Sequence, residues 1–211
     1  MIRLMIDDKY TCMPWDEIDA VVFDVGNVLL SFKSNELLNR FVPERPDLHE
    51  ELDIRIFKSP YWCMRDRNSA TLEEVISAMS SNAPELEPYI RRIMTCWIDL
   101  PEIQEGVDAL KICKAHGKKL FALTNYADKE FAYACENHEF FNLFDGFVVS
   151  AREHLVKPGL EIYAHLIYRF GLDPEKTLFI DDSPANIEGA LESGWQGLCY
   201  NKPGKLSQFF I

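Results

Sequence analysis

The sequence lacks the long apolar runs that mark membrane proteins. No run of apolar residues approaches the length of about 20 residues that a membrane-spanning helix needs. Asp7 and Asp8 also interrupt the N-terminal segment, where a signal peptide would have an unbroken apolar stretch. We therefore expect a cytoplasmic protein with no membrane partner.

Closely spaced cysteine pairs are absent as well. Six cysteines occur, and they lie far apart in the chain: Cys12, Cys63, Cys96, Cys113, Cys135 and Cys199. None forms a CxxC motif, so neither a zinc site nor a disulfide framework is indicated. Isolated thiols of this kind usually pack as small core residues in a reducing compartment.

Positive charge is scarce. The chain has 22 lysines and arginines against 34 aspartates and glutamates, which gives a formal net charge of −12. Such a field repels phosphate backbones, so we expect no nucleic-acid partner. A small anionic substrate would need local lysines or a metal ion to overcome the same field.

Apolar residues are plentiful, at 47% of 211 residues, which is enough for a sizeable core. Short apolar runs typical of buried strands end at Asp24, Asn125, Ser150 and Asp182, and a fifth covers residues 197–200. Segments with helical spacing lie between them, at 102–116, at 160–170 and from Pro184 to Gly194, the last with Ser183 as its N-cap. This alternation favours an α/β fold with a doubly wound parallel sheet.

The first predicted strand is followed by an unusually long connection. About ninety residues separate it from the second strand, far more than one crossover helix needs. Thr71 and Glu74 form a capping-box pattern within this segment, and a later stretch has an apolar stripe of Ile90, Ile93, Met94 and Trp97. We interpret residues 33–100 as an inserted helical lobe, 17–32 and 101–211 as the α/β core, and 1–16 as a polar lead-in without an assigned function.

Polar side chains stand at the ends of the first four predicted strands. They are Asp24, then Thr124 with Asn125, then Ser150 shortly before Lys157, and finally Asp181 with Asp182. Ligands of open parallel sheets bind at the carboxyl ends of the strands, so these residues should converge on one crevice. Carboxylates that meet without arginine partners repel one another unless a hard cation lies among them. Mg²⁺ fits this role because it prefers oxygen ligands.

These segments together resemble the haloacid dehalogenase-like hydrolase superfamily. The matching motifs are "VVFDVGNVL", "FALTNY", "KPGLEIY" and "FIDDSPANIEGA", in that superfamily's order and spacing over residues 18–200. The lobe at 33–100 resembles the superfamily's helical cap. The resemblance implies a Rossmann-like core whose cap closes over a small phosphorylated substrate.

The resemblance also implies a nucleophile and a metal site. Asp24 would attack phosphorus and form an aspartyl-phosphate, a form of covalent catalysis. Asp24, Asp182 and the backbone carbonyl of Gly26 would hold Mg²⁺, and Asp181 would join the metal directly or through water.

Four further residues are expected around the substrate on the same grounds. Thr124 and Lys157 would hold phosphoryl oxygens as part of the catalytic set. Asn125 and Asn186 would add hydrogen bonds as outer members of the substrate-binding set.

The segment "YWCMRDRNS" at 61–69 is the candidate for substrate contacts from the lobe. It carries aromatic surface and two guanidinium groups, at Arg65 and Arg67, which suit a polar phosphate-bearing substrate. The alternative is a solvated turn before the helix that is capped at Thr71.

Gly26 departs from the superfamily's usual pattern. Most of its phosphatases have an aspartate at this position, which protonates the leaving oxygen and then activates water. One reading is a Mg²⁺-dependent phosphatase that carries this variant motif and acts on a small phosphate ester, with a sugar phosphate as the first candidate. The others are a 2-haloacid dehalogenase, which has no use for the pair Asp181 and Asp182, and a catalytically silent relative that binds a ligand or partner. In a phosphatase, Asp66 or a bound water could supply the missing proton.

Overall fold

A computed structural model describes residues 2–3, 12–13, 15–96, 98–201 and 206. Its central sheet contains β3 (Ala20–Phe23), β4 (Lys119–Thr124), β5 (Gly146–Val149), β6 (Thr177–Asp181) and β7 (Gln196–Cys199). The five strands are parallel and lie in the order β5-β4-β3-β6-β7. The predicted doubly wound parallel sheet is confirmed, and each strand lies within a residue or two of its predicted end.

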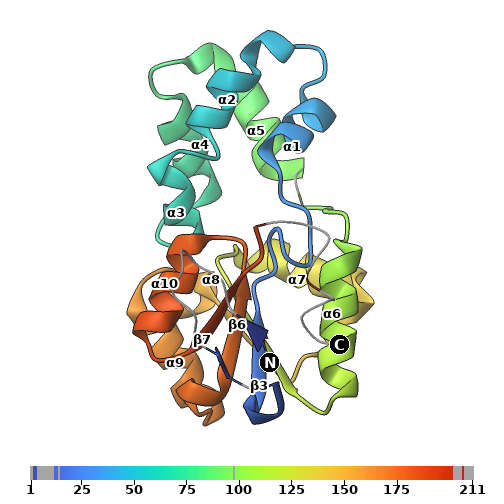
Figure 1. Ribbon diagram of the computed structural model, residues 1–211. Coiled ribbons are helices and arrows are strands. Elements are labelled where there is room, and N and C mark those ends of the chain that lie inside the picture. Colours follow the sequence, from blue (N-terminus) through green and yellow to red (C-terminus); the bar gives the residue numbers. More distant parts are fainter. Residues whose placement is uncertain (1, 4–11, 14, 97, 202–205, 207–211) are drawn as a thin grey trace.

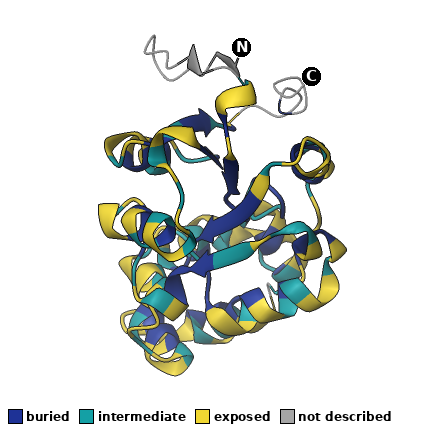
Figure 2. Ribbon diagram, turned by 90° about the horizontal axis from the view of Figure 1, so that it is seen from below, coloured by how far each residue is buried: buried dark blue, intermediate teal, exposed yellow. Residues whose placement is uncertain are grey.

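Helices cover both faces of this sheet. Successive residues of β3 enter two different apolar clusters, Val21 and Phe23 on one face, Ala20 and Val22 on the other. The first face is covered by α6 (Gln104–Ala115) and α7 (Asp128–Asn137), and the second by α9 (Leu160–Phe170) and α10 (Pro184–Glu192). Figure 2 shows the buried strands between helices that are exposed on their outer sides. Burial on both faces explains why the strand sequences are continuous apolar runs.

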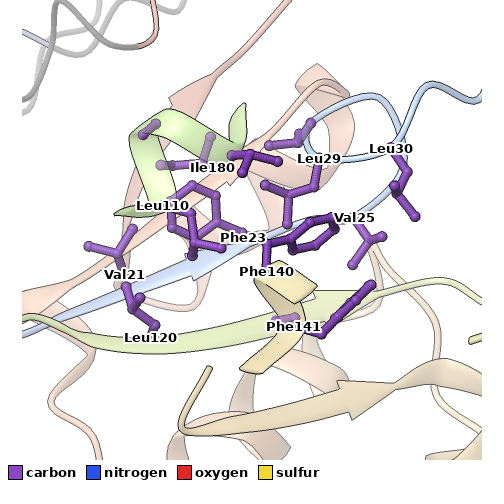
Figure 3. Close-up of a cluster of buried hydrophobic side chains, with 14 of the residues drawn as sticks. Val21, Phe23, Val25, Leu29, Leu30, Leu110, Leu120, Phe140, Phe141 and Ile180 are labelled. Carbon is purple, nitrogen blue, oxygen red and sulfur yellow. The ribbon is translucent and has the colours of Figure 1, made fainter. Parts of the chain in front are cut away.

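The loop after β3 is packed into the first cluster. Val25, Leu29 and Leu30 of this loop lie beside Phe23 in Figure 3, and Leu110 of α6 packs in the same group. None of these five side chains is more than 1% exposed. The backbone that carries Asp24 and Gly26 is therefore held by apolar burial on both sides of the polar residues.

The inserted lobe lies between β3 and α6 in the sequence. Its helices are α1 (Ser34–Phe41), α2 (His49–Arg55), α3 (Pro60–Asp66), α4 (Leu72–Ser80) and α5 (Glu87–Cys96), with short 3-10 turns η2 (Pro46–Leu48) and η3 (Pro84–Leu86). They bury an apolar cluster of their own, which includes Leu52, Ile56, Ile76, Ile90 and Ile93. Trp97, which we expected on this apolar face, lies outside the described residues. Figure 1 shows the lobe beyond the carboxyl ends of the strands, above the sheet.

The remaining elements are short. They are the antiparallel pair β1 (Ile2–Arg3) and β2 (Cys12–Met13), the helix α8 (Ser150–Glu153), and the 3-10 turns η1 (Trp15–Glu17), η4 (Glu139–Leu143) and η5 (Pro174–Lys176). Most of the predicted lead-in at 1–16 lies outside the described residues. No helix within the described ranges combines the length and the apolar character that crossing a membrane requires.

Two local predictions need correction. Ser183 occupies the N-cap position of α10, but its side chain makes no capping hydrogen bond; its backbone N–H instead donates to Asp181 Oδ1 at 2.8 Å. The carboxylate of Asp181 is a stronger acceptor than a hydroxyl and binds the backbone N–H of the N-cap residue itself. Cys113 is buried as expected for a core thiol, whereas Cys63 and Cys96 are exposed. The predicted capping box is present, with both Thr71–Glu74 hydrogen bonds.

Candidate active site

Asp24 directly follows β3, the central strand of the sheet. Its backbone N–H donates to the carbonyl of Ile180 in β6 at 2.8 Å, which continues the β3–β6 ladder by one residue. Its Oδ1 accepts from the backbone N–H of Val25 at 2.7 Å and lies 2.8 Å from Lys157 Nζ. Its Oδ2 has no hydrogen-bond partner among the described residues. One carboxylate oxygen is thus held and the other is free to react.

Lys157 joins two carboxylates at the centre of the site. Its Nζ lies 2.8 Å from Asp24 Oδ1 and 2.6 Å from Asp181 Oδ2, and the residue is 4% exposed. Burial alone would lower the pKa of Lys157, but the charges of Asp181 and Asp24 raise it above its usual value. The ammonium group therefore keeps its charge in the interior, where a phosphate group would need it.

Asp181 is fully buried, and its carboxylate is saturated with donors. Its Oδ1 accepts from the Ser183 N–H at 2.8 Å, Asn186 Nδ2 lies 3.0 Å from both oxygens, and Lys157 donates to Oδ2. A carboxylate with this many donors has little capacity left for a metal ion. The geometry therefore favours a role in orienting Lys157 and leaves direct metal contact to Asp24 and Asp182.

The site carries an excess of negative charge. Burial raises the pKa of Asp24 to about 7; the nearby Lys157 opposes this shift, and Asp181 and Asp182 add to it. Burial also raises the pKa of Asp182, as does the charge of Asp181, while contact with the Asn27 side chain lowers it. A cation placed here would relieve the repulsion that these shifts reflect.

The donor set fits a magnesium ion. Asp24, Asp181 and Asp182 each offer a carboxylate oxygen, and these oxygens lie within 4.8 Å of one another. Hard carboxylate oxygens are the donors that Mg²⁺ prefers, and Asp24 and Asp182 would hold it directly while Asp181 stays bound to its own donors. A Cβ placed on Gly26 would meet no atom within 4 Å, so the position beside the carboxylates is open. The contribution of the Gly26 carbonyl stays a prediction.

Asn125 and Asn186, expected to bind substrate, make hydrogen bonds within the protein. Asn125 Nδ2 donates to the Lys157 carbonyl at 3.0 Å, and its Oδ1 accepts from the Lys157 N–H at 2.9 Å. The side-chain amide of Asn186 donates to the Asp181 carboxylate, as described above. Both carboxamides therefore help to position the lysine–carboxylate pair, Asn125 through the Lys157 backbone and Asn186 through Asp181.

The two arginines of the lobe have different surroundings. Arg65 is buried, where its guanidinium forms an ion pair with Glu130 of α7 and donates to the carbonyl of Met94. This cation is already neutralised, so the expected substrate contact is not supported. Arg67 is exposed and stays a candidate for substrate binding.

Thr124 ends β4 beside Asp24, and the structure buries it to 1% exposure. Its strand lies next to β3 in the sheet, so its side chain belongs to the same carboxyl-end edge. Its contact with phosphoryl oxygens stays a prediction.

Sequence reasoning assigned no positioning role to Asn27, and it placed Ser150 at the site without naming its contacts. Asn27 has a positive φ of 55°, accepts a hydrogen bond from the Phe32 N–H at 3.0 Å and contacts Asp182. Its place directly after Gly26 was a usable signal, because asparagine tolerates left-handed backbone better than most residues. Ser150 accepts from the Tyr126 N–H at 2.9 Å and is fully buried; no sequence pattern pointed to that contact.

Comparison with known proteins identifies the family. A family model for haloacid dehalogenase-like hydrolases matches residues 18–194. A doubly wound core with a carboxylate-rich site at its strand ends is the arrangement described above. The chain belongs to the haloacid dehalogenase-like hydrolases and is an enzyme of that class.

Similar proteins include a named phosphatase and a named flavin mononucleotide hydrolase. The sesquiterpene phosphatase astK of Aspergillus oryzae is 27% identical over 183 residues, which cover 85% of this chain and 88% of that protein. Flavin mononucleotide hydrolase 1 of Arabidopsis thaliana is 36% identical over 52 residues, 25% of this chain and 21% of the relative.

Solved structures share the fold. A dehalogenase crystal structure superposes with a TM-score of 0.72 at 18% identity, covering 95% of this chain and 88% of that one. A haloacid dehalogenase-family enzyme from Bacteroides thetaiotaomicron, in complex with magnesium and inorganic phosphate, gives 0.68 at 21% identity, with coverage of 89% and 96%. Because identity is this low, these neighbours establish the fold alone.

Proposed function

We propose that the protein is a Mg²⁺-dependent phosphohydrolase that acts on a small phosphate ester through an aspartyl-phosphate on Asp24. One observation carries the proposal. Asp24, Asp181 and Asp182 bring carboxylate oxygens within 4.8 Å of one another, beside a buried lysine that reaches two of them. Such a site pairs a nucleophile with the positive charge that a phosphate dianion needs.

Each residue has a task in this reaction. Lys157 holds Asp24 Oδ1, so that Oδ2 forms the new bond to phosphorus while the ester P–O bond breaks. Water then attacks the same phosphorus, the bond to Asp24 breaks, and inorganic phosphate leaves. Thr124 would bind a phosphoryl oxygen beside Lys157. Mg²⁺, held by Asp24, Asp182 and the Gly26 carbonyl, would supply charge neutralisation of the phosphoryl group.

The lobe at 33–100 is proposed to act as a cap. It lies over the carboxyl ends of the strands, where it would exclude water from the site during phosphoryl transfer (Figure 1). The exposed Arg67 of the lobe and the aromatic trio Phe32, Phe57 and Trp62, with ring centroids 5.5–5.7 Å apart, are the candidates for contact with the organic part of a substrate.

The dehalogenase reading is less well supported. The shared fold does not separate the two activities, because dehalogenases and Mg²⁺–phosphate complexes occur among the structural neighbours. The chemistry of the site does, since metal-free attack on a carbon–halogen bond gains nothing from the adjacent carboxylate of Asp182. The names of two curated relatives support the same choice, since one is a phosphatase and the other a hydrolase of flavin mononucleotide, a phosphate ester.

Phosphate release from a substrate panel tests the proposal. The panel contains p-nitrophenyl phosphate, sugar phosphates as the first candidates, and farnesyl phosphate and flavin mononucleotide as suggested by the relatives. We expect release with Mg²⁺, none with excess EDTA, and none from Asp24→Asn. Asp19→Asn is the matched control, because it makes the same change at the exposed opposite end of β3 and should keep full activity.

Trapping of the phosphorylated nucleophile and an assay of halide release test the mechanism further. Beryllium fluoride should form its adduct on Asp24, detected by fluorine resonance in the wild type and absent from Asp24→Asn. Full activity in EDTA, or chloride release from 2-chloropropionate without metal, would contradict the phosphatase assignment.

A further inference from the structure

Position 26 lacks the proton donor that ester cleavage needs. Gly26 has no side chain, and a Cβ built there would meet nothing within 4 Å. The leaving oxygen of an alkyl phosphate is too basic to depart without a proton, so another group must supply it. Among the described residues of the lobe, Asp66 at the end of α3 offers a partly buried carboxyl group for this task.

Contacts of three successive residues, Arg65, Asp66 and Arg67, hold the end of α3 against the core. The neighbouring Arg65 pairs with Glu130 of α7, as described above. The Asp66 carbonyl accepts a hydrogen bond from Ser150 Oγ at 2.7 Å, and the Arg67 carbonyl lies 2.9 Å from His154 Nδ1. The end of α3 is thus fastened to the residues that follow β5, the strand that leads to Lys157.

The Asp66 carboxyl group has no hydrogen bond or ion pair among the described residues, although it is partly buried. Burial raises its pKa to about 7, while the charges of Arg65 and Lys157 lower it. Those two cations are the charged groups that act on it; Glu130 on α7 is neutralised by Arg65, and His154 after α8 faces the Arg67 carbonyl. The Ser150 hydroxyl that holds the Asp66 backbone also accepts from the Tyr126 N–H, just after β4, the strand beside β3. The end of α3 therefore lies at the same carboxyl edge of the sheet as Asp24.

We propose that Asp66 is the general acid and base of this enzyme, supplied by the lobe in place of the side chain missing at Gly26. The inference rests on the proposed phosphatase function. In the first step Asp24 bonds to phosphorus, the ester P–O bond breaks, and the Asp66 carboxyl gives its proton to the leaving oxygen. In the second step the Asp66 carboxylate takes a proton from water, whose oxygen displaces Asp24 from phosphorus. Asp66 is then protonated again for the next turnover.

Steady-state kinetics of Asp66→Asn on aryl and alkyl phosphates of graded leaving-group pKa test this role. Because kcat/KM reports the steps up to departure of the leaving group, its loss should grow with leaving-group pKa. We expect a loss of about 10²-fold or more for an alkyl phosphate and a small loss for p-nitrophenyl phosphate. The kcat should fall for all substrates, with a burst of p-nitrophenol, because the second step also loses its base.

The pH profile is a second readout. In the wild type, kcat/KM for an alkyl phosphate should fall as the pH rises through about 7, because Asp66 must be protonated. Asp66→Asn should lose this limb, and Asp66→Glu should restore it. Asp47→Asn, at an exposed ion pair with Arg45 in the lobe, is the matched control and should change neither the leaving-group dependence nor the pH profile.

Installing a carboxyl group at the open position gives a rescue. Gly26→Asp in the Asp66→Asn background should recover the alkyl-phosphate activity, since the new side chain enters unoccupied space. An unchanged leaving-group slope in folded Asp66→Asn, or the same slope in both Asp66→Asn and Asp66→Glu, would overturn the assignment. A wild type that releases phosphate from no ester would instead refute the phosphatase function on which it rests.

Discussion

Lys157 balances the charge of two buried carboxylates. Its ammonium group is within 2.8 Å of Asp24 and 2.6 Å of Asp181, and its side chain is 1% exposed. The lysine is itself positioned through its backbone, because Asn125 bonds both its N–H and its carbonyl. Catalytic charge and folding stability therefore depend on the same side chain.

Replacing Lys157 by methionine keeps an unbranched chain but removes the charge. Two buried carboxylates are then left without their cation, and loss of one partner of a buried ion pair costs about 3–5 kcal/mol. We expect the free energy of unfolding at neutral pH, measured by urea denaturation in EDTA, to fall by this amount. Activity on p-nitrophenyl phosphate should fall to background.

The pH dependence of the unfolding free energy shows whether the lost charge causes the destabilisation of Lys157→Met. In Lys157→Met the folded-state pKa of the paired carboxylates is raised above the unfolded value, so stability should recover as the pH falls through that raised pKa. Lys176→Met, at an exposed pair with Asp19 of 3.7 Å, is the control and should cost less than about 1 kcal/mol at every pH. A pH-independent loss in Lys157→Met would indicate lost packing instead.

At the level of elements, α6 supports the loop that carries the nucleophile. The Ile103 N–H donates to the Leu29 carbonyl at 2.8 Å, just before the helix begins. Within the helix, a Cβ placed on Gly106 would lie 1.8 Å from the Val28 carbonyl oxygen. The helix and the loop approach so closely that only glycine fits.

Gly106→Ala should therefore displace the loop between Asp24 and Leu30. Overpacking of a buried contact costs about 1–3 kcal/mol, and this contact is with backbone, which yields less easily than a side chain. We expect a loss of stability in urea denaturation together with a loss of kcat, because Asp24 stands at the start of this loop and would be displaced with it. Gly26→Ala is the control for stability: its Cβ meets nothing within 4 Å, so the unfolding free energy should stay within about 0.5 kcal/mol of wild type. Unchanged kcat in a destabilised Gly106→Ala would separate the loop from catalysis.

The elements were largely predictable because their signals are local. The helix 160–170 ends at Gly171, whose φ of 62° is a left-handed conformation that glycine adopts without strain. Strand ends were found from apolar runs, and the rule that parallel strands share one carboxyl edge was enough to predict that Asp24, Lys157 and Asp182 converge.

The sequence did not predict which partner each of these side chains contacts. Asn125 was expected near a substrate, yet its partner is the backbone of a residue 32 positions away. Arg65 likewise pairs with Glu130 on a different helix. Such partners depend on the packing of distant segments, and one sequence has no local pattern that encodes it.

On the scale of the whole molecule, the site concentrates negative charge in a chain that is already acidic. The net charge is −12, and three carboxylates with one lysine stand at the centre of the sheet. This arrangement stores electrostatic repulsion where β3 and β6 meet. Without a cation, the folded protein is less stable than its apolar core would allow, and a bound cation would release that repulsion.

Mg²⁺ should therefore raise the melting temperature. A ligand at a hundredfold excess over its Kd adds about 2.7 kcal/mol, and each kcal/mol shifts the transition of a chain of this size by about 2–4 °C. Differential scanning calorimetry with Mg²⁺, compared with sodium chloride at equal ionic strength, measures the effect without any substrate.

Asp182→Asn provides the decisive control. Burial and Asp181 raise the pKa of Asp182, so its charge opposes folding at neutral pH, and the variant without metal should melt at or above the wild-type temperature. The same variant should lose most of the response to Mg²⁺, because it lacks one of the two carboxylates with open coordination. An equal Mg²⁺ shift in wild type and Asp182→Asn would place the cation elsewhere on this acidic molecule.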